Sequence, residues 1–215
     1  MPTNVALSRT WARALARLVL ASVLIPVVAM AQPSSPQAAE AAAWAALSRP
    51  GAVVLFRHAN APGVGDPPGM QVGDCSTQRN LDEVGRQQAR RIGEQFRQRG
   101  VHIGLVRVSQ WCRAQETARI AFAGQSLAGI RDDPAFNSWF AGHGDARRQT
   151  DQARELLRRW SGPGVLVVVA HQVNLTALTG VVAGSAEGLV VRPAASGRPG
   201  GGDAPFEVVG RISPP

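Results

Sequence analysis

The chain has 215 residues, of which 23 are basic and 15 acidic, giving a formal net charge of +8 at pH 7. All the basic residues are arginines, and they are spread along the chain. Because nucleic-acid-binding proteins concentrate positive charge in a patch or stripe, this distribution argues against a nucleic-acid partner.

The first segment is predicted to be a secretory signal peptide. Residues 1–17 contain three arginines and no acid, and residues 18–31 are apolar and end in Ala-Met-Ala31. A basic start, a short apolar centre and a small-residue end are typical of a signal that is cleaved, here after Ala31. A membrane anchor is the alternative, but it needs about 20 apolar residues, and Pro26 interrupts this run. We therefore expect a periplasmic or secreted protein without stable membrane insertion after cleavage.

The remaining chain is long enough for one domain with a sizeable core. We expect a linker and a short alanine-rich helix within residues 32–50, the helix covering residues 38–47. The folded domain is then expected to cover residues 51–215.

Strands and helices are predicted to alternate within this domain. Continuous apolar runs of strand length, typical of strands buried on both faces, cover residues 52–56 and 165–170, and a further strand is predicted for residues 103–108. Helices are predicted for residues 80–100, 112–122, 145–160 and 173–182, and two further strands for residues 187–191 and 206–212. Asn80, three residues before Glu83, is the expected N-cap of the first of these helices. The alternation indicates an α/β domain with a mainly parallel sheet.

Polar side chains follow each of the apolar strands. The first strand leads into Arg57 and His58, the second into the segment that contains Arg113, and the third into His171. Ligands of open α/β sheets bind at the carboxyl ends of the strands, so these four residues are expected to meet at one edge. Two guanidinium groups and two imidazoles suit a phosphate dianion.

This arrangement also suits nucleophilic catalysis. The neighbouring arginines would lower the pKa of an imidazole and keep it neutral. A neutral imidazole in line with phosphorus can attack it, which divides hydrolysis into two easier steps. The other cationic groups would stabilise charge on the phosphoryl oxygens.

Four motifs in the same order resemble those of the histidine phosphatase superfamily, in its phosphoglycerate mutase-like branch. They are Val53-Val-Leu-Phe-Arg57-His58-Ala59, Leu81-x-x-x-Gly85-x-x-Gln88-Ala89, Ser109-x-x-x-Arg113-Ala114-x-x-Thr117-Ala118 and Val168-Val-Ala-His171. The resemblance implies a three-layer α/β/α fold with a mainly parallel central sheet and an antiparallel edge strand.

The resemblance also implies roles for individual residues. His58 corresponds to the nucleophile that becomes phosphohistidine. Arg57, Arg113 and His171 correspond to the rest of the phosphate pocket, and Asn60 falls where the family often has a further polar contact.

Two positions depart from the family pattern. The glycine that follows the nucleophile is Ala59 here. The family's general acid, a glutamate in a Leu-x-Glu pattern, has Phe136-Asn137-Ser138 as its nearest counterpart. Asp133, Asp132 and Glu116 are the candidate replacements, and without any acid the enzyme would be slow or restricted to good leaving groups, since acid catalysis contributes roughly 10²–10⁴-fold.

Cys75 and Cys112 are the two cysteines. In an oxidising compartment they predict one disulfide bond, with two buried free thiols as the alternative. No histidine lies near either in the sequence, so a zinc site is not expected. No metal or cofactor is expected.

Together these observations predict a phosphomonoester hydrolase that acts through a phosphohistidine intermediate on a small phosphorylated substrate. The alternatives are a non-catalytic phosphate-binding module, a phosphomutase and a protein phosphohistidine phosphatase. The leaving group is expected to lie against residues 61–76 and 131–144. There Trp139 and Phe140 suggest an apolar or sugar-stacking wall, with a place in the core as the alternative. The natural substrate and the oligomeric state do not follow from the sequence.

Overall fold

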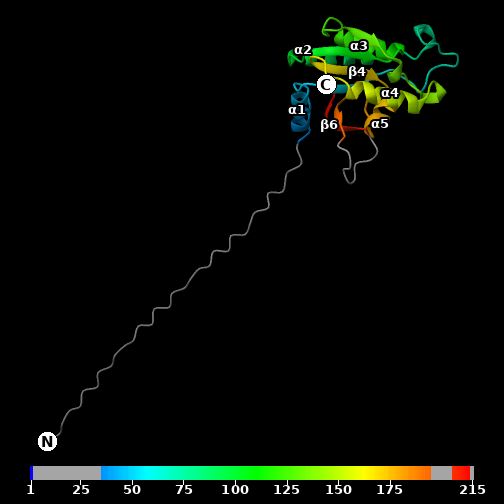
Figure 1. Ribbon diagram of the computed structural model, residues 1–215. Helices are drawn as coiled ribbons and strands as arrows, with labels where there is room; N and C mark the ends of the chain where they lie inside the picture. Colours follow the sequence, from blue (N-terminus) through cyan, green and yellow to red (C-terminus); the bar gives the residue numbers. More distant parts are fainter. Residues whose placement is uncertain (2–34, 195–204, 214–215) are drawn as a thin grey trace. The chain divides into compact units, whose positions relative to one another are not determined.

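The computed structural model describes residues 1, 35–194 and 205–213. The signal peptide and cleavage site expected in residues 1–31 lie outside the described residues, apart from Met1. The described residues form a mixed α/β fold whose central sheet has the strand order β3-β2-β4-β1-β5-β6 (Figure 1). The strands are β1 (Val53–Arg57), β2 (Ile103–Val108), β3 (Ile130–Asp132), β4 (Val165–Ala170), β5 (Gly188–Pro193) and β6 (Phe206–Ile212).

The centre of the sheet is parallel and one side is antiparallel. β4 pairs in parallel with both β1 and β2, and β2 pairs in parallel with β3. β5 is antiparallel to β1 and to β6. The predicted α/β class with a mainly parallel sheet is confirmed. The sheet differs from the expectation in two respects. β5 makes two antiparallel pairings, with β1 and with β6, and β3 is an edge strand that the sequence did not reveal.

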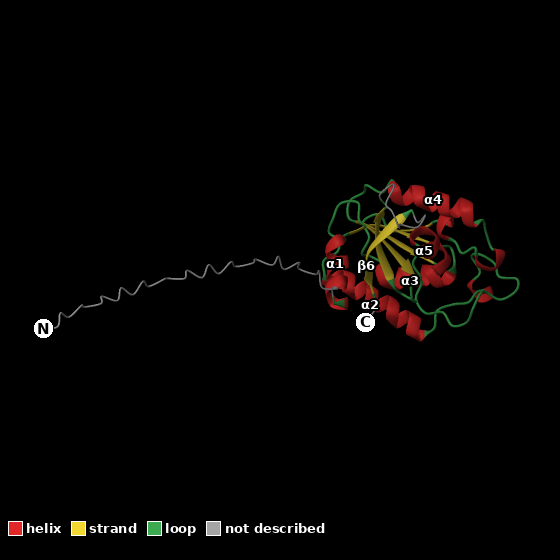
Figure 2. Ribbon diagram, turned by 90° about the horizontal axis from the view of Figure 1, so that it is seen from below, coloured by secondary structure: helices red, strands yellow, loops and turns green. Residues whose placement is uncertain are grey.

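Helices cover both faces of the sheet (Figure 2). They are α1 (Pro36–Ala46), α2 (Glu83–Gln98), α3 (Cys112–Phe122), α4 (Ala146–Arg158) and α5 (Gln172–Thr179). Alternate residues of each strand point to opposite faces. Val54 and Phe56 therefore join the core with α1, α2 and α3, whereas Val53 and Leu55 join the core with α4 and α5. The order of layers is helix, sheet, helix.

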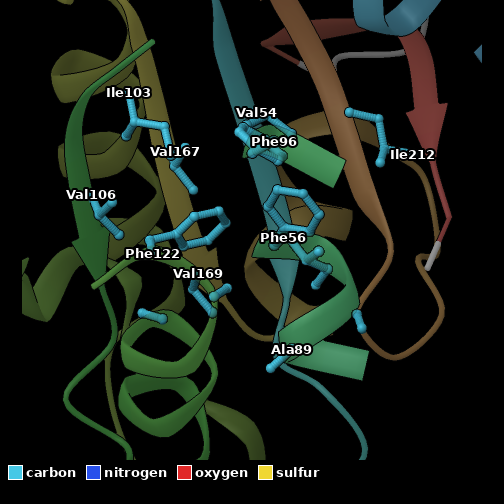
Figure 3. Close-up of a cluster of buried hydrophobic side chains, with 14 of the residues drawn as sticks. Val54, Phe56, Ala89, Phe96, Ile103, Val106, Phe122, Val167, Val169 and Ile212 are labelled. Carbon is cyan, nitrogen blue, oxygen red and sulfur yellow. The ribbon is translucent and has the colours of Figure 1, made fainter. Parts of the chain in front are cut away.

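Aromatic rings fill the larger of the two cores (Figure 3). The ring of Phe56 lies 5.9 Å from that of Phe96 and 6.0 Å from that of Phe122, measured between centroids. All three side chains are fully buried. This packing fixes β1 against α2 and α3, and so positions the residue that follows β1 relative to both helices.

The N-terminal helix is part of the fold. α1 packs against β6, and its Trp44 ring meets Phe96 edge-on at 5.2 Å. A Cβ atom added to Gly210 would lie 2.4 Å from Cβ of Ala43, so this close contact requires glycine in the strand. Residues 36–46 therefore belong to the domain that the sequence led us to begin at residue 51.

The start of α2 differs from the prediction. Its N-cap is Asp82, whose carboxylate accepts a hydrogen bond from the backbone N–H of Gly85 at 2.7 Å. Asn80 instead donates to the carbonyl oxygens of Cys75 and Gln78. Among the described residues, no helix is long and apolar enough to span a membrane.

Candidate active site

The carboxyl edge of the parallel strands gathers the four residues singled out in the sequence. Arg57 ends β1 and His58 follows it, Arg113 lies in the first turn of α3, and His171 directly follows β4. The two imidazole rings lie 5.3 Å apart between centroids. His58, Arg113 and His171 are each 3% exposed, so the cluster is buried.

His58 is held in one neutral form. Its Nδ1 lies 2.8 Å from the carbonyl oxygen of Ala59, and its Nε2 lies 3.3 Å from Nε of Arg113. Because a carbonyl only accepts and a guanidinium only donates, the proton must be on Nδ1 and the lone pair on Nε2. Burial and the positive charge of Arg113 lower the pKa of His58 to about 3. His58 is therefore a neutral imidazole, with its one proton on Nδ1, across the physiological pH range.

The second histidine is oriented by Ser109 and, through it, by Asn137, the residue before Ser138, which corresponds to the family's glutamate. Nε2 of His171 lies 2.8 Å from Oγ of Ser109, and this hydroxyl lies 3.3 Å from Oδ1 of Asn137. Nδ1 of His171 is buried and has no hydrogen-bond partner among the described residues. Burial, followed by the effect of His58, lowers the pKa of His171 well below its usual value. Asn137 thus occupies a structural position behind the second imidazole.

Arg113 is bound end-on by a carboxylate that the sequence did not identify. Its Nη1 and Nη2 donate to Oδ1 and Oδ2 of Asp66 at 2.7 and 3.1 Å. Asp66 also accepts from the indole N–H of Trp111 at 3.1 Å and from the backbone N–H of Arg79 at 3.0 Å. Burial alone would raise the pKa of Asp66, but these hydrogen bonds hold it below its usual value. The end-on pair leaves the Nε side of the guanidinium facing His58.

Two further arginines surround the histidines. Arg57 donates from Nη1 to the carbonyl oxygen of Ala183 at 3.0 Å, and its Nε has no partner among the described residues. Arg79 donates from Nε to the carbonyl oxygen of Gly65 at 2.8 Å and from Nη1 to that of Ala61. Arg79 was missed in the sequence because it lies in an irregular segment and belongs to no motif.

The structure explains why the family motifs contain particular residues. A Cβ atom at Gly85 would lie 2.1 Å from the carbonyl oxygen of Asn60, so α2 can approach the nucleophile loop only with glycine there. Oε1 of Gln88 accepts a hydrogen bond from the backbone N–H of Asn60 at 2.8 Å, and Oγ1 of Thr117 accepts one from the backbone N–H of Ala59 at 3.0 Å. These contacts fix the two residues that follow His58. Ala59 does not have a positive φ, so its backbone conformation does not require glycine.

The predicted contact residue Asn60 does not line the cavity next to the histidines. Its side-chain amide instead donates to Asp82 at 2.8 Å, which joins the nucleophile loop to the cap of α2.

The three candidate acids also lie outside that cavity. Asp133 is paired with Arg107 and caps a 3₁₀ turn at Pro134–Phe136. Asp132 accepts from Gln115 on the surface, and Glu116 is paired with Arg86 at 2.7 Å. Each of these three carboxylates therefore has a hydrogen-bond or ion-pair partner away from the cavity. The carboxylates that do line the cavity are Asp66 and Asp151 among the described residues.

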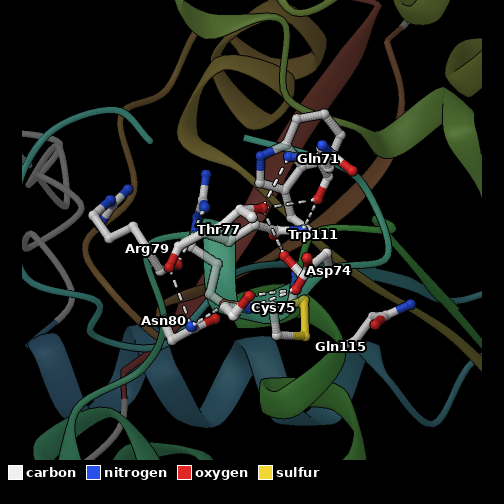
Figure 4. The surroundings of a disulfide bond; sticks show 12 residues. Gln71, Asp74, Cys75, Thr77, Arg79, Asn80, Trp111 and Gln115 are labelled. Carbon is white, nitrogen blue, oxygen red and sulfur yellow. Dashed lines mark hydrogen bonds between the residues drawn. A yellow bond between two sulfur atoms is a disulfide. The ribbon is translucent and has the colours of Figure 1, made fainter. Parts of the chain in front are cut away.

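The two cysteines form a disulfide bond (Figure 4). It joins Cys75, in the long loop after β1, to Cys112, the residue directly before Arg113. Asn80 donates to the carbonyl oxygen of Cys75 at 2.7 Å, which further fixes this end of the loop. The bond therefore connects the loop that carries Asp66 to the helix that carries its partner Arg113.

The cluster opens into a cavity of about 1260 Å³. As expected from the sequence, its walls include parts of the two irregular segments, at residues 63–66 and 138–140. The other walls come from α4 and α5, which the sequence did not indicate. Within the described part of the chain, no three His, Cys, Asp or Glu side chains are grouped so that they could hold a metal ion.

The fold and the site define an α/β protein with two buried neutral histidines and several arginines at the carboxyl edge of its sheet. The sequence model of the histidine phosphatase superfamily (branch 1) matches residues 53–163. The chain belongs to this superfamily, and membership supports phosphatase activity. A search of curated proteins finds no match to the sequence.

One solved structure shows the same fold, and others are similar to it at lower scores. The protein histidine phosphatase SixA, complexed with tungstate, superimposes with a TM-score of 0.53 at 17% identity, covering 76% of this chain and 97% of SixA. Mycobacterial hydrolase 2 gives a TM-score of 0.47 at 20% identity, over 73% of this chain and 87% of its own. Phosphoserine phosphatase from Entamoeba histolytica gives 0.47 at 12% identity, over 66% and 90%.

Proposed function

We propose that the protein hydrolyses phosphate monoesters through a phosphohistidine intermediate on His58, in the periplasm or outside the cell. The observation that carries this proposal is the state of His58. Its Nδ1 proton is held by the carbonyl oxygen of Ala59, and its buried Nε2 carries a lone pair beside the guanidinium of Arg113. A neutral imidazole with a fixed tautomer is the form that can attack phosphorus.

The reaction proceeds in two displacements. In the first, Nε2 of His58 forms a bond to phosphorus while the bond from phosphorus to the ester oxygen breaks, and this oxygen takes a proton from water as the alcohol leaves. In the second, water attacks phosphorus, the bond from phosphorus to Nε2 breaks, and inorganic phosphate leaves. The Nε–H group of Arg113 provides a donor for the phosphoryl oxygens in both steps, and His171 provides a second donor in the tautomer that carries the ring proton on its unpaired Nδ1.

The leaving group receives little help from the protein. Of the two carboxylates among the described cavity residues, Asp66 is saturated by hydrogen bonds and Asp151 is paired with Arg154 at 3.2 Å. Asp66 has a lowered pKa and so is ionised near neutral pH. We expect the first step to be fastest for esters whose alcohols are acidic, since general acid catalysis contributes roughly 10²–10⁴-fold when a donor is present.

The location outside the cytoplasm rests on two observations. The Arg-rich, apolar start of the chain has the pattern of a secretory signal. The Cys75–Cys112 disulfide belongs to the class of bond that persists in oxidising compartments. Fractionation of cells that express the tagged protein tests this part, and a tag retained in the cytoplasm together with an uncleaved chain would contradict it.

Phosphate release from p-nitrophenyl phosphate tests the activity. We expect turnover by the purified protein, inhibition by vanadate, and loss of turnover in His58→Ala. His102→Ala is the matched control, because His102 is exposed and does not line the cavity. Acid-labile, base-stable labelling of the protein by a radioactive ester would identify the phosphohistidine. Equal inactivity of the wild type and His58→Ala over a range of pH and esters would refute catalysis.

That last outcome would favour a non-catalytic phosphate-binding module. The observation in favour of such a module is that no carboxylate among the described cavity residues is free to protonate a leaving group. Titration calorimetry with inorganic phosphate distinguishes the two, because a binding module would retain phosphate affinity without turnover.

A further inference from the structure

The cavity extends well beyond the phosphate-binding cluster. Its volume of about 1260 Å³ exceeds the roughly 300–1,000 Å³ of typical small-molecule sites, so it can hold an organic group much larger than phosphate. One wall is a stripe of α4 that comprises Arg147, Thr150, Asp151 and Arg154. The spacing of these residues places them on a single face of the helix. This stripe lies outside every family motif that the sequence contains.

The cavity lining includes large apolar side chains that are exposed to solvent. Val64, Phe140 and Val182 are 90%, 48% and 60% exposed, and all three line the cavity. Exposed large apolar side chains are normal when they are scattered, but a group of them around one opening indicates a binding surface. Val173 and Ala177 of α5 add further apolar lining. The organic part of a ligand would therefore contact aliphatic and aromatic carbon.

The charge of the lining exceeds what one phosphate can neutralise. Five arginines and two aspartates line the cavity among the described residues, so five positive and two negative charges leave +3, with both histidines neutral. A phosphate dianion neutralises two of these charges. Arg154 is paired with Asp151, whereas Arg147 has no hydrogen bond or ion pair within the described part of the chain. Arg147 is therefore the cation left for a second anionic group.

We infer that the preferred substrates are phosphate monoesters of amphiphilic alcohols, with an apolar body against Val64, Phe140 and Val182 and a second anionic group that binds Arg147. This inference rests on the proposed function, since it names the class of ester that His58 acts on. A guanidinium on a helix face can form a bidentate pair with a carboxylate or a phosphate. The exposed apolar side chains then contact the chain that links the two charges.

Two series of esters with the same primary-alcohol leaving group test the inference. One series consists of alkyl phosphates of increasing chain length, and the other of ω-carboxyalkyl phosphates of matching length. We expect kcat/KM of the alkyl series to rise about threefold to fourfold for each buried methylene until the chain leaves the cavity. We expect the terminal carboxylate to add about tenfold at the chain length that reaches Arg147.

Variants on α4 assign the effect to one side chain. Arg147→Gln should abolish the preference for the carboxylate and leave the dependence on alkyl length unchanged. Arg148→Gln is the matched control, because Arg148 is the next residue of the same helix, is exposed and does not line the cavity. Phe140→Ala should reduce the gain per methylene and retain the carboxylate preference.

Failure of the inference is distinct from failure of the proposed function. An enzyme that hydrolyses p-nitrophenyl phosphate but shows no carboxylate preference at any chain length would overturn the inference alone. Equal loss of the preference in Arg147→Gln and Arg148→Gln would do the same. If the protein is inert towards all esters, dissociation constants of the matching alkylphosphonates and ω-carboxyalkylphosphonates, measured by calorimetry, give the same comparison without turnover.

Discussion

Replacing Asp66 by Asn tests the buried pair that supports the phosphate site. The side chains of Arg113 and Asp66 are 3% and 4% exposed, and the carboxylate accepts four hydrogen bonds. An amide in this place would present an N–H group to donors and leave the guanidinium charge buried without a counterion. Breaking such a pair costs about 3–5 kcal/mol, which we expect as the loss in free energy of unfolding of Asp66→Asn.

The same substitution should also reduce catalysis. Without its end-on partner, Arg113 can rotate its Nε away from the reacting nitrogen of His58, and a misplacement of about 1 Å can lower a rate by about 10²-fold. We therefore expect kcat/KM for p-nitrophenyl phosphate to fall by about 10²-fold. Urea denaturation and steady-state kinetics measure the two effects.

Asp74→Asn is the control for this substitution. Asp74 lies in the same loop but is exposed, and it caps the short turn at Cys75–Thr77. We expect Asp74→Asn to change both quantities much less than Asp66→Asn. If the two variants unfold at the same urea concentration and retain the same kcat/KM, the role assigned to Asp66 is wrong.

Three further predictions concern pH, the disulfide and a glycine. Because the pKa of His58 is about 3 when folded and near 6.5 when unfolded, the unfolded chain binds the proton first. The contribution of His58 to the free energy of unfolding should therefore fall by about 1.4 kcal/mol per pH unit as pH decreases from 6.5 towards 3. His58→Asn should remove this contribution and leave that of His171, whose pKa is also lowered, as measured by urea denaturation at each pH. The Cys75–Cys112 disulfide spans a sequence separation of 37, so its reduction by dithiothreitol should lower the free energy of unfolding by about 4 kcal/mol. Reduction should also raise KM, and an unchanged KM would contradict a role of the disulfide in positioning Asp66 and Arg113. Gly85→Ala should lower the free energy of unfolding by about 2–3 kcal/mol, because the alanine Cβ would clash with the carbonyl oxygen of Asn60. A variant that unfolds at the same urea concentration as the wild type would exclude this clash.

The sequence predicted the elements that are buried on both faces. β1, β2 and β4 were visible because strands covered by helices on each side are almost entirely apolar, and Arg57 and Arg107 are the only charged residues in these three strands. β3 was not visible, because it is an edge strand of three partly exposed residues that include Arg131 and Asp132. The N-cap of α2 was placed at Asn80, although Asp82 is also a good cap. Only the fold shows that the amide of Asn80 is engaged by two loop carbonyls.

The site was predictable where each side chain follows a strand and not where it comes from a loop. His58 and His171 follow β1 and β4 directly, so the topology alone brings them together. Asp66 and Arg79 lie in a loop without periodicity, and Asp66 meets Arg113 across 47 residues of sequence. No local pattern predicts which of the acids in such a loop will face the pocket.

The packing of α1 on β6 has a consequence for the order of events during synthesis. Ala43, Trp44 and Leu47 are buried in the same core as Ile212 of β6. Such contacts between segments far apart in sequence form late, because a long loop must close before they can be made. The part of α1 that packs against β6 therefore stays uncovered on the growing chain until residues 206–212 have been made, although Trp44 can already contact Phe96 of α2. A nascent chain of this topology depends on chaperones for longer than one whose first helix packs against its sequence neighbours.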